Sequence, residues 1–366
     1  MRITECEFVR LNIPFRVAFQ HAAASRSHSD AIIIRVMTDD GVEGFGEIQA
    51  RPYVTGEDND TIWDKLVPLA GQIIGQSLTT PAAVYQCLDS LVGYTKAPAL
   101  AGGFDIALLD ALDVEGRIDC QEIFGPRRAS EHMKCLTIGE NYAGERLKKQ
   151  AHLARVGGYA VVKLKVAGSE DSARVRDLRD WVGSGIAIRL DVNGAMNFSA
   201  ASALLETCKD CKIESIEEPL DRASPQLAAE LLQLHEISGV PLVADESVCT
   251  LADLESWARS GGYQAINVRI GKCGGISGAA AMLKAAKAAG FDVVAGTMVG
   301  ETSVLLKASQ KMLEYWNDLD YVEGIDQSRQ LLIAEPVVAT KGQNDKHFEW
   351  IAKYVNEFCI SRQIAN

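Results

Sequence analysis

Four strand-like runs between residues 161 and 247 decide the fold: VVKLK at 161–165, IRLDVNG at 188–194, IEEP at 216–219 and VADES at 243–247. Each is a short apolar run, typical of a buried strand, that carries or ends on charged residues. The first holds Lys163 and Lys165, and the next three lead to Asp191, Glu217 and Asp245. Because the ends of parallel strands meet at one rim of a sheet, we expect these side chains to converge. The pattern predicts a divalent metal facing a lysine base.

The same strand signal recurs at regular intervals from residue 135 onward. Short apolar segments begin near Cys135, Val161, Ile186, Ile213, Leu242, Ala265, Phe291 and Tyr321. Helix-like stretches such as 199–205 and 277–289 separate them. This alternation predicts βα units, and eight strands predict closure into a TIM-type barrel. An open doubly wound sheet is the alternative, but it usually has a glycine-rich phosphate turn after its first strand, which this sequence lacks.

Residues 1–125 follow a different pattern. The runs 31–36 and 42–47 are strand-like and flank Asp39-Asp40-Gly41, a good hairpin signal. Helical spacing follows from about residue 60 to residue 125. The chain is therefore predicted to be an α/β protein, with an α+β module at residues 1–125 in front of a barrel at residues 126–335.

Composition narrows the classes of function. Hydrophobic residues make up 47% and charged residues 23% of the 366 residues, as in an ordinary globular protein. A formal net charge of -12 argues against nucleic-acid binding, but not against a small anionic substrate. No segment resembles a signal peptide or a membrane span. Nine cysteines, an odd number, favour a reducing compartment, so we expect a cytoplasmic location.

Asp191, Glu217 and Asp245 suit a hard divalent cation. Carboxylates held close together repel one another unless a cation neutralises them, and oxygen ligands with open positions favour Mg²⁺. Each acid taken alone could instead cap a following helix, as Asp does in short βα loops. Three in register behind a lysine pair favour the metal site, with Mg²⁺ as cofactor and Mn²⁺ as a substitute.

Lys163 and Lys165 are two residues apart on a predicted strand, so both face the barrel interior. Their apolar neighbours argue against a basic edge that faces solvent. Two ammonium groups beside each other and near a metal are expected to depress each other's pKa. A neutral amine would then be accessible near neutral pH, to take the α-proton of a metal-bound carboxylate.

These motifs, in this order and at this spacing, resemble the enolase superfamily, specifically the muconate-lactonizing-enzyme subgroup of the mandelate racemase/muconate lactonizing enzyme family. Lys-Cys-Gly-Gly at 272–275, Gly-Phe-Gly-Glu at 44–47 and the loop 51–57 add to the likeness, which covers nearly the whole chain. The resemblance implies a capping domain and a modified (β/α)₇β barrel. It also implies a C-terminal tail, residues 336–366, that returns to the cap.

The resemblance implies roles for the residues above. The three strand-end carboxylates would bind Mg²⁺, and Lys165 would be the acid/base. Lys163 would neutralise the substrate carboxylate and tune Lys165. Asn193 and Glu246 would contact these residues and hold them in position, without binding the metal themselves.

Substrate contacts are expected from the cap and from the end of the seventh barrel strand. The resemblance implies that loops around 19–26 and 51–57 enclose the substrate. Arg51 and Tyr53 would then contact the end of the substrate that lies away from the metal, and Glu301 is a further candidate contact. Helix capping by Glu301, and a structural loop around Arg51 and Tyr53, explain these residues equally well. The expected partner is a small carboxylate, with no nucleic acid or membrane, and barrels of this kind often form symmetric homo-oligomers.

The sequence departs from the subgroup on the sixth barrel strand, Ile266-Asn267-Val268-Arg269. The resemblance implies a second catalytic lysine where Arg269 stands, and Lys272 is expected to point to the other face. A guanidinium is a poor proton shuttle, although it can place a positive charge beside an enolate or bind a carboxylate. A salt bridge outside the site is the alternative for Arg269.

Arg269 therefore favours one-base chemistry by Lys165. The expected function is a Mg²⁺-dependent cycloisomerase, or a lyase such as a syn-dehydratase, that acts on a small carboxylate. A racemase or epimerase of an amino-acid derivative or dipeptide is the alternative, and it would need another group opposite Lys165. A non-catalytic binding protein on the same scaffold is a further alternative, against which the intact lysine and carboxylates argue.

Overall fold

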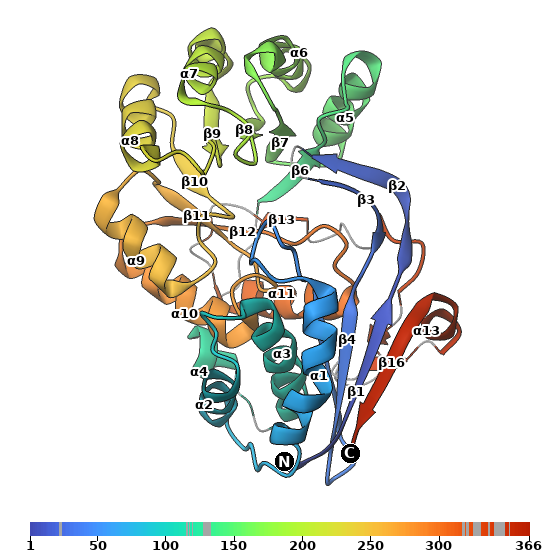
Figure 1. Cartoon of the computed structure of the whole chain (residues 1–366). Coiled ribbons are helices and arrows are strands. Elements are labelled where there is room, and N and C mark those ends of the chain that lie inside the picture. The colour runs from blue at the N-terminus through green and yellow to red at the C-terminus, as the bar shows by residue number, and fades with distance from the viewer. Residues whose placement is uncertain are drawn as a thin grey trace.

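A computed structural model of the chain shows an α/β barrel with an α+β cap packed beside it (Figure 1). The structure describes residues 1–21, 24–114, 116, 118, 120–126, 133–316, 319, 322–324, 331–335, 337–339, 348–350 and 352–366. Within these ranges, no helix has the length and apolar character needed to cross a bilayer.

Among the described residues, eight parallel strands close into a barrel. Their spatial order is β10-β11-β12-β13-β6-β7-β8-β9, and β13 pairs with β6 to close the ring. The strands are β6 (Lys134–Ile138), β7 (Val161–Lys165), β8 (Ala187–Asp191), β9 (Ile213–Glu217), β10 (Leu242–Ala244), β11 (Ala265–Val268), β12 (Asp292–Ala295) and β13 (Val322–Glu323). Most of their residues are buried, because helices cover the outside and side chains fill the inside. The predicted barrel and its strand positions are confirmed.

One α-helix lies between each barrel strand and the next in the described chain, which gives the expected (β/α)₇β order. These helices are α5 (Gly144–Val156), α6 (Ser172–Val182), α7 (Phe198–Thr207), α8 (Leu227–Ser238), α9 (Leu251–Ser260), α10 (Gly275–Ala288) and α11 (Ser303–Tyr315). Polar caps mark several starts: Asn197 accepts from the backbone N–H of Ala200 at 2.9 Å, at the start of α7. Such caps satisfy N–H groups that the first helical turn leaves unpaired.

The cap is built on a four-stranded antiparallel sheet with the order β16-β1-β4-β5. Its strands are β16 (Cys359–Ala365), β1 (Ile3–Leu11), β4 (Ile32–Thr38) and β5 (Glu43–Ile48), and its helices are α1 (Asn59–Ile73), α2 (Pro81–Leu91), α3 (Pro98–Val114) and α4 (Cys120–Phe124). The β4–β5 hairpin confirms the turn predicted at 39–41. Smaller elements are β2 (Ile13–His21), β3 (Ala24–Ser29), β14 (Val337–Ala339), β15 (Phe348–Trp350) and α13 (Ala352–Phe358).

The last strand, β16, pairs with the first, β1, so that Ala365 lies opposite Cys6. The two chain ends consequently lie close together at the cap (Figure 1). The domain boundaries expected at residues 125 and 335 stay predictions, since residues 127–132 and 336 lie outside the described ranges.

Helix α3 of the cap also contacts the start of barrel helix α10. Asp105, which is buried in α3, accepts from Tyr94 OH at 2.8 Å and from the backbone N–H of Ser277 at 3.0 Å. A Cβ on Gly275 would lie 2.6 Å from Asp105 Oδ2, so only glycine permits this approach. Asp105 of the capping domain therefore satisfies a backbone N–H at the N-terminus of α10, and so holds the loop between β11 and α10 in place.

Two glycines let β5 lie directly on α3. An ideal Cβ on Gly44 would lie 2.2 Å from Ala107 O, and one on Gly46 would lie 2.0 Å from Gly103 O. Both distances are far below van der Waals contact. Glycine is therefore required at positions 44 and 46 by the close packing of β5 on α3.

We expect Gly46→Ala to destabilise the protein by about 3 kcal/mol, because the new methyl group overlaps a backbone oxygen that moves only if α3 moves. Urea unfolding followed by circular dichroism measures this. Gly71→Ala is the matched control, because Gly71 is an exposed glycine of α1 with no atom within 4 Å of the added Cβ. Alanine there should stabilise by roughly 0.5–1 kcal/mol. Equal stability of Gly46→Ala and wild type would contradict the packing argument.

Candidate active site

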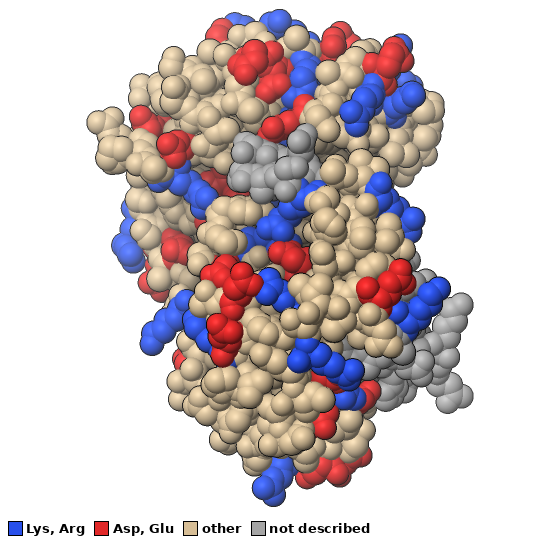
Figure 2. All heavy atoms as spheres, turned by 45° about the vertical axis from the view of Figure 1, so that its right-hand side comes forward, with Lys and Arg blue, Asp and Glu red and all other residues tan. Residues whose placement is uncertain are grey.

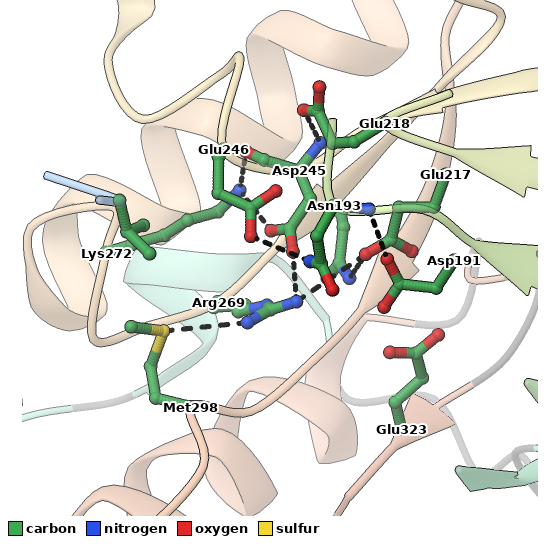
Figure 3. A network of polar contacts seen from close by, with 12 residues as sticks. Asp191, Asn193, Glu217, Glu218, Asp245, Glu246, Arg269, Lys272, Met298 and Glu323 are labelled. Carbon is green, nitrogen blue, oxygen red and sulfur yellow. Dashed lines mark hydrogen bonds and ion pairs between the residues drawn. The ribbon is translucent and has the colours of Figure 1, made fainter. Parts of the chain in front are cut away.

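The strand-end groups meet at one rim of the barrel interior. Lys163 and Lys165 lie on β7, and both are buried. Parallel pairing places Lys165 beside Asp191 of β8, and Asp191 beside Glu217 of β9. Asp245 follows β10 directly and is also buried (Figure 3). Strand register therefore brings together carboxylates that lie far apart in the sequence.

Buried cations neutralise these carboxylates. Lys163 Nζ lies 3.1 Å from Asp191 Oδ2 and 2.9 Å from Glu217 Oε1, and Lys165 Nζ lies 2.8 Å from Asp191 Oδ2. Burial would raise the pKa of Asp191, but Lys163 and Lys165 outweigh it and hold the pKa below its usual value. The pKa of Glu217 is also lowered despite burial, because Arg189 and Lys163 lie beside it. Both acids are therefore ionised at neutral pH.

The expected drop in lysine pKa is wrong for Lys163. Burial lowers the pKa of Lys163, but Asp191, Glu217 and Glu323 outweigh burial and raise it well above the ordinary value. Lys163 is therefore charged at neutral pH, which suits it to hold an anion and not to accept a proton. Carboxylates on neighbouring strands, which a pattern along one strand cannot show, reverse the sign of the shift.

Lys165 is held by two acceptors and linked through one of them to Glu246. Its Nζ donates to Asp191 Oδ2 at 2.8 Å and to Asn193 Oδ1 at 2.5 Å. Asn193, which has a left-handed φ of 49°, donates from Nδ2 to Glu246 Oε1 at 3.1 Å. Burial, with Asp245 and Glu218 nearby, raises the pKa of Glu246 to about 8. Asn193 thus connects the lysine to a carboxyl group that is largely protonated at neutral pH.

Arg269 comes directly after β11, which is four strands away from β7 in either direction around the barrel. Its Nη2 contacts Asp245 Oδ2 and lies 3.6 Å from Glu217 Oε1 (Figure 3). Burial would lower the pKa of Arg269, but Asp245 and Glu217 outweigh it and raise the pKa above the ordinary value. A permanent positive charge therefore stands on the side of the barrel opposite Lys165.

Lys272 is closer to the site than expected. Alternation predicted that it points to the other face, but the chain leaves the strand after Val268 and turns, so that the Lys272 N–H bonds to Arg269 O at 3.1 Å. The Lys272 ammonium bonds to the Asp245 backbone oxygen and lies 2.9 Å from Asp245 Oδ1. The Asp245 carboxylate thus has Lys272 at one oxygen and Arg269 at the other.

Arg189 and Glu323 also belong to this charge cluster, although no sequence motif singled them out. Arg189 contacts Glu217 Oε2 and its Nη1 lies 3.0 Å from Glu323 Oε1, while Lys163 Nζ lies 3.0 Å from Glu323 Oε2. Arg189 is two residues before Asp191 on β8, so alternation was a signal that could have found it. Glu323 had no such signal, because only closure of the ring between β13 and β6 brings it here.

A cavity lies at this rim, between the barrel and the cap. Its lining includes Lys163, Lys165, Asp191, Asn193, Glu246, Arg269 and Glu323 from the barrel, and Arg51, Tyr53 and Val54 from the cap. Figure 2 shows Lys and Arg atoms in a recess near the middle of the molecular surface. Of the predicted metal ligands, Glu217 and Asp245 lie behind the lining, while Lys163 and Arg269, which contact them, form part of it.

Arg51 lines the cavity, but its guanidinium makes hydrogen bonds to other groups of the protein. Its side chain is buried, with Nη1 donating to Asp30 Oδ1 at 2.9 Å and Nη2 donating to Val299 O at 3.0 Å. The first bond stays within the cap, and the second ties the start of the loop 51–57 to the segment that follows β12. Arg51 therefore positions the cap loop, whatever else it contacts.

Barrel side chains hold the rest of this loop over the cavity. Arg222 Nη2 donates to Tyr53 O at 2.9 Å, and Cys249 Sγ donates to Val54 O at 3.4 Å. The second loop expected at the substrate, residues 19–26, joins β2 to β3, but its residues 22 and 23 lie outside the described ranges.

Glu301 is buried behind the cavity wall and is not among the lining residues that the structure describes. Its Oε1 accepts from the backbone N–H of Met298 at 2.5 Å. Thr302, and not Glu301, caps α11 by accepting from the N–H of Val304, so the helix-capping alternative for Glu301 is not seen, and its contact with a substrate stays a prediction. Burial, with Glu47 nearby, raises the pKa of Glu301 to about 8, so the group is mostly neutral at pH 7.

We expect Glu301→Gln to match wild type in stability near about pH 4.5, to become the more stable of the two as the pH rises, and to flatten the pH dependence. The raised pKa means that folded wild type binds this proton more tightly than the unfolded chain does. The stability that this proton contributes is present below about pH 4.5 and is lost as pH rises to about pH 8. Urea unfolding at about pH 5, about pH 7 and about pH 9 should show wild type losing stability relative to Glu301→Gln as the pH rises. Parallel profiles would show that Glu301 does not titrate in this range.

The donor set suits Mg²⁺ or Mn²⁺, which prefer oxygen ligands. Among the described residues, however, no three His, Cys, Asp or Glu side chains come together as a metal cage. Neighbouring carboxylates share cations instead: Lys163 lies between Asp191 and Glu217, and Arg269 lies between Glu217 and Asp245. Two carboxylates that approach one nitrogen can approach a metal ion in the same place. The residues therefore fit a divalent cation that takes the place of one of these nitrogens.

Two family models match the chain. The model described as "Enolase C-terminal domain-like" matches residues 146–346, and the model described as "Mandelate racemase / muconate lactonizing enzyme, N-terminal domain" matches residues 3–120. Together they cover most of the barrel and most of the cap.

Curated proteins with similar sequences are isomerases by name. The N-succinyl-L-Arg/Lys racemase of Bacillus cereus is 28% identical over 84% of this chain and 83% of its own length. A hydrophobic dipeptide epimerase of Enterococcus faecalis is 25% identical over 84% and 86%. Muconate cycloisomerase 1 of Pseudomonas putida is 27% identical over 84% and 81%. The crystal structure of the Bacillus cereus racemase superposes with a TM-score of 0.88 over 100% of both chains at 22% identity, which supports the fold.

Proposed function

Because the chain belongs to the mandelate racemase/muconate lactonizing enzyme family of the enolase superfamily, we propose that it is a metal-dependent racemase or epimerase of an amino-acid derivative. The family predicted from sequence motifs is confirmed, and so is the prediction of an enzyme of this superfamily. The racemase or epimerase alternative agrees better with the similar proteins than the cycloisomerase or dehydratase that Arg269 favoured.

One observation carries the proposal. Lys165 and Arg269 line the same cavity and follow strands on opposite sides of the barrel, with buried carboxylates between them. A substrate carbon held in this cavity would have an ammonium group on one face and a guanidinium group on the other. Inversion at a carbon atom needs this arrangement, because the proton leaves from one face and returns to the other.

Lys165 is the proposed base. Its Nζ is held by Asp191 and Asn193, and the neutral amine would take the proton next to the substrate carboxylate. Lys163, which stays charged beside Asp191 and Glu217, would hold that carboxylate. These contacts fix both nitrogens before the substrate arrives, so little reorganisation is needed at the moment of reaction.

Asp191, Glu217 and Asp245 would hold Mg²⁺. The bound cation would stabilise the second negative charge that develops on the carboxylate oxygens as the α-proton leaves. An amine cannot remove so weakly acidic a proton without such stabilisation.

Arg269 would return the proton on the opposite face. It is a strong donor of hydrogen bonds but a weak acid, because a guanidinium keeps its proton at any workable pH. Proton return from this face should consequently be slower than exchange at Lys165. The chain is therefore expected to exchange the α-proton of one enantiomer faster than it inverts the centre.

The test is incubation with Mg²⁺ in D₂O, followed by mass spectrometry and chiral analysis. The panel holds N-succinyl-L-arginine, N-succinyl-L-lysine, hydrophobic dipeptides and muconate. Deuterium gain with slower inversion would support the proposal. Inversion as fast as exchange would show an efficient second base and refute the role given to Arg269. The absence of exchange and inversion with every amino-acid derivative would refute the racemase itself.

A cycloisomerase is the second candidate. The replacement of a lysine by Arg269 favours it, because ring opening or closure needs proton transfer on one face only. In the same experiment, conversion of muconate without deuterium exchange into the amino-acid derivatives would favour this candidate.

A further inference from the structure

The Arg269 guanidinium lies between two carboxylates that were assigned above to a metal ion. Nη2 contacts Asp245 Oδ2 and lies 3.6 Å from Glu217 Oε1. Figure 3 shows the side chain reaching toward both acids from the side of Met298. One nitrogen thus approaches oxygens from β9 and from the end of β10, which a divalent cation bound to both acids would also approach.

The groups around the Arg269 guanidinium, other than the two carboxylates, bind it weakly. Nη1 donates to Met298 Sδ at 3.7 Å, a weak acceptor. Nε is buried and has no hydrogen-bond partner among the described residues. Gly296, directly after β12, lies close beside this side chain: a Cβ there would overlap Asn267 Oδ1 at 2.4 Å and make a tight contact with Arg269 Nε at 3.1 Å. Two of the three guanidinium nitrogens are therefore poorly satisfied, so the contact with the carboxylates is what holds the side chain in place.

A guanidinium and a dication cannot both occupy the space between Glu217 and Asp245. Like charges repel strongly when they share ligands in a buried site. Lys272 bonds to the other oxygen of Asp245, so it does not stand in the same place. Lys163 lies at the same Glu217 oxygen, but its other ion pairs are with Asp191 and Glu323, so Arg269 is the described side chain that approaches both Glu217 and Asp245.

We propose that the Arg269 side chain competes with the divalent cation for Glu217 and Asp245. Metal binding releases the guanidinium into the cavity, where it serves as an anion-binding group. The proposal rests on the metal-dependent function above. Arg269 already belongs to the cavity lining, so a small rotation exposes its planar donors to a substrate carboxylate. Metal and substrate would then strengthen each other's binding, since the metal frees the arginine that the substrate needs.

The first experiment measures Mn²⁺ affinity by electron paramagnetic resonance in the absence of substrate. Removing the competitor in Arg269→Met should tighten Mn²⁺ binding by at least about tenfold, because the metal no longer displaces a buried ion pair. Arg222→Met is the matched control. It removes the same charge near the site, but Arg222 bonds only to the backbone oxygens of Tyr53 and Glu246 in the contacts described. Its Mn²⁺ affinity should stay within about twofold of wild type.

The second experiment follows release of the side chain directly. Phenylglyoxal reacts with accessible guanidinium groups, and peptide mass spectrometry locates the product. Labelling of Arg269 in the wild type should rise at least about fivefold on addition of Mn²⁺, since metal binding exposes the group. Arg189, whose side chain is fully buried, serves as the internal reference and should stay protected.

The outcomes separate this proposal from the proposed function. Tighter Mn²⁺ binding in Arg269→Met together with metal-dependent labelling supports it. Equal or weaker Mn²⁺ binding in Arg269→Met overturns it, and the metal-dependent function survives if wild type still binds Mn²⁺. If neither protein binds Mn²⁺, both proposals fail. Metal binding by the variant alone overturns the proposed release, because the metal then never displaces Arg269 in wild type.

Discussion

Lys165→Ala should lower the rate of α-proton exchange by about 10²–10⁴-fold, which is the effect expected for loss of a general base. The side chain is the only described lysine that both lines the cavity and bonds to Asn193. Substrate affinity should change little, because Lys163 remains to hold a carboxylate. Deuterium exchange into N-succinyl-L-lysine, followed by mass spectrometry, measures the rate.

Lys165→Arg separates loss of the base from loss of charge. Arginine keeps a cation beside Asp191 but cannot be neutral at a workable pH, so this variant should also be inactive. Both variants should unfold within about 2 kcal/mol of wild type, since Lys163 still neutralises Asp191. Exchange at a near-normal rate in either variant would rule out Lys165 as the base.

Asp245→Asn should abolish turnover and cost about 3–5 kcal/mol of folding stability, because it leaves buried cations without their counter-ion. The Asp245 carboxylate is fully buried, with Lys272 at Oδ1 and Arg269 at Oδ2. Burial would raise the pKa of Asp245, but these two cations outweigh it and hold the pKa well below its usual value. Asparagine keeps the shape and removes the charge. Urea unfolding measures the stability, and the D₂O assay measures turnover.

Asp253→Asn is the matched control for Asp245→Asn. Asp253 accepts from the N–H groups of Cys249 and Thr250 at 3.1 and 2.8 Å, at the start of α9, and lies outside the described cavity lining. An amide oxygen can still accept these bonds, so the cost should be about 1 kcal/mol or less, with turnover retained. Near-normal turnover in Asp245→Asn would overturn the assignment of Asp245 as a metal ligand.

Much of the architecture follows from local patterns. Short apolar runs, which the structure shows as barrel strands of two to five residues, alternate with amphipathic helices, and their regular spacing favours buried strands. Two lysines at spacing two must share a face, and acids at strand ends must share a rim. For this reason the barrel, its strand positions, the hairpin at 39–41 and the convergence of Lys165, Asp191 and Glu217 could be predicted.

Contacts between distant strands could not be predicted in the same way. The pKa of Lys163 rises where a drop was expected, because Glu217 and Glu323 stand beside it once the ring closes. Lys272 reaches Asp245 because the chain turns after Val268 and is no longer governed by strand alternation. Glu301 is buried behind the wall of the cavity, which depends on how the cap meets the barrel.

By itself, the sequence determined the fold, the family and the residue types available for chemistry, because periodicity and motif spacing are properties of the chain. Only the tertiary structure decided the charge state of each group and its partner, because electrostatic energy depends on distances across the barrel and on burial. Arg269 illustrates the division. Its identity marks a departure that is visible in the sequence, but its place between Glu217 and Asp245 exists only because β9, β10 and β11 are neighbours in a closed ring.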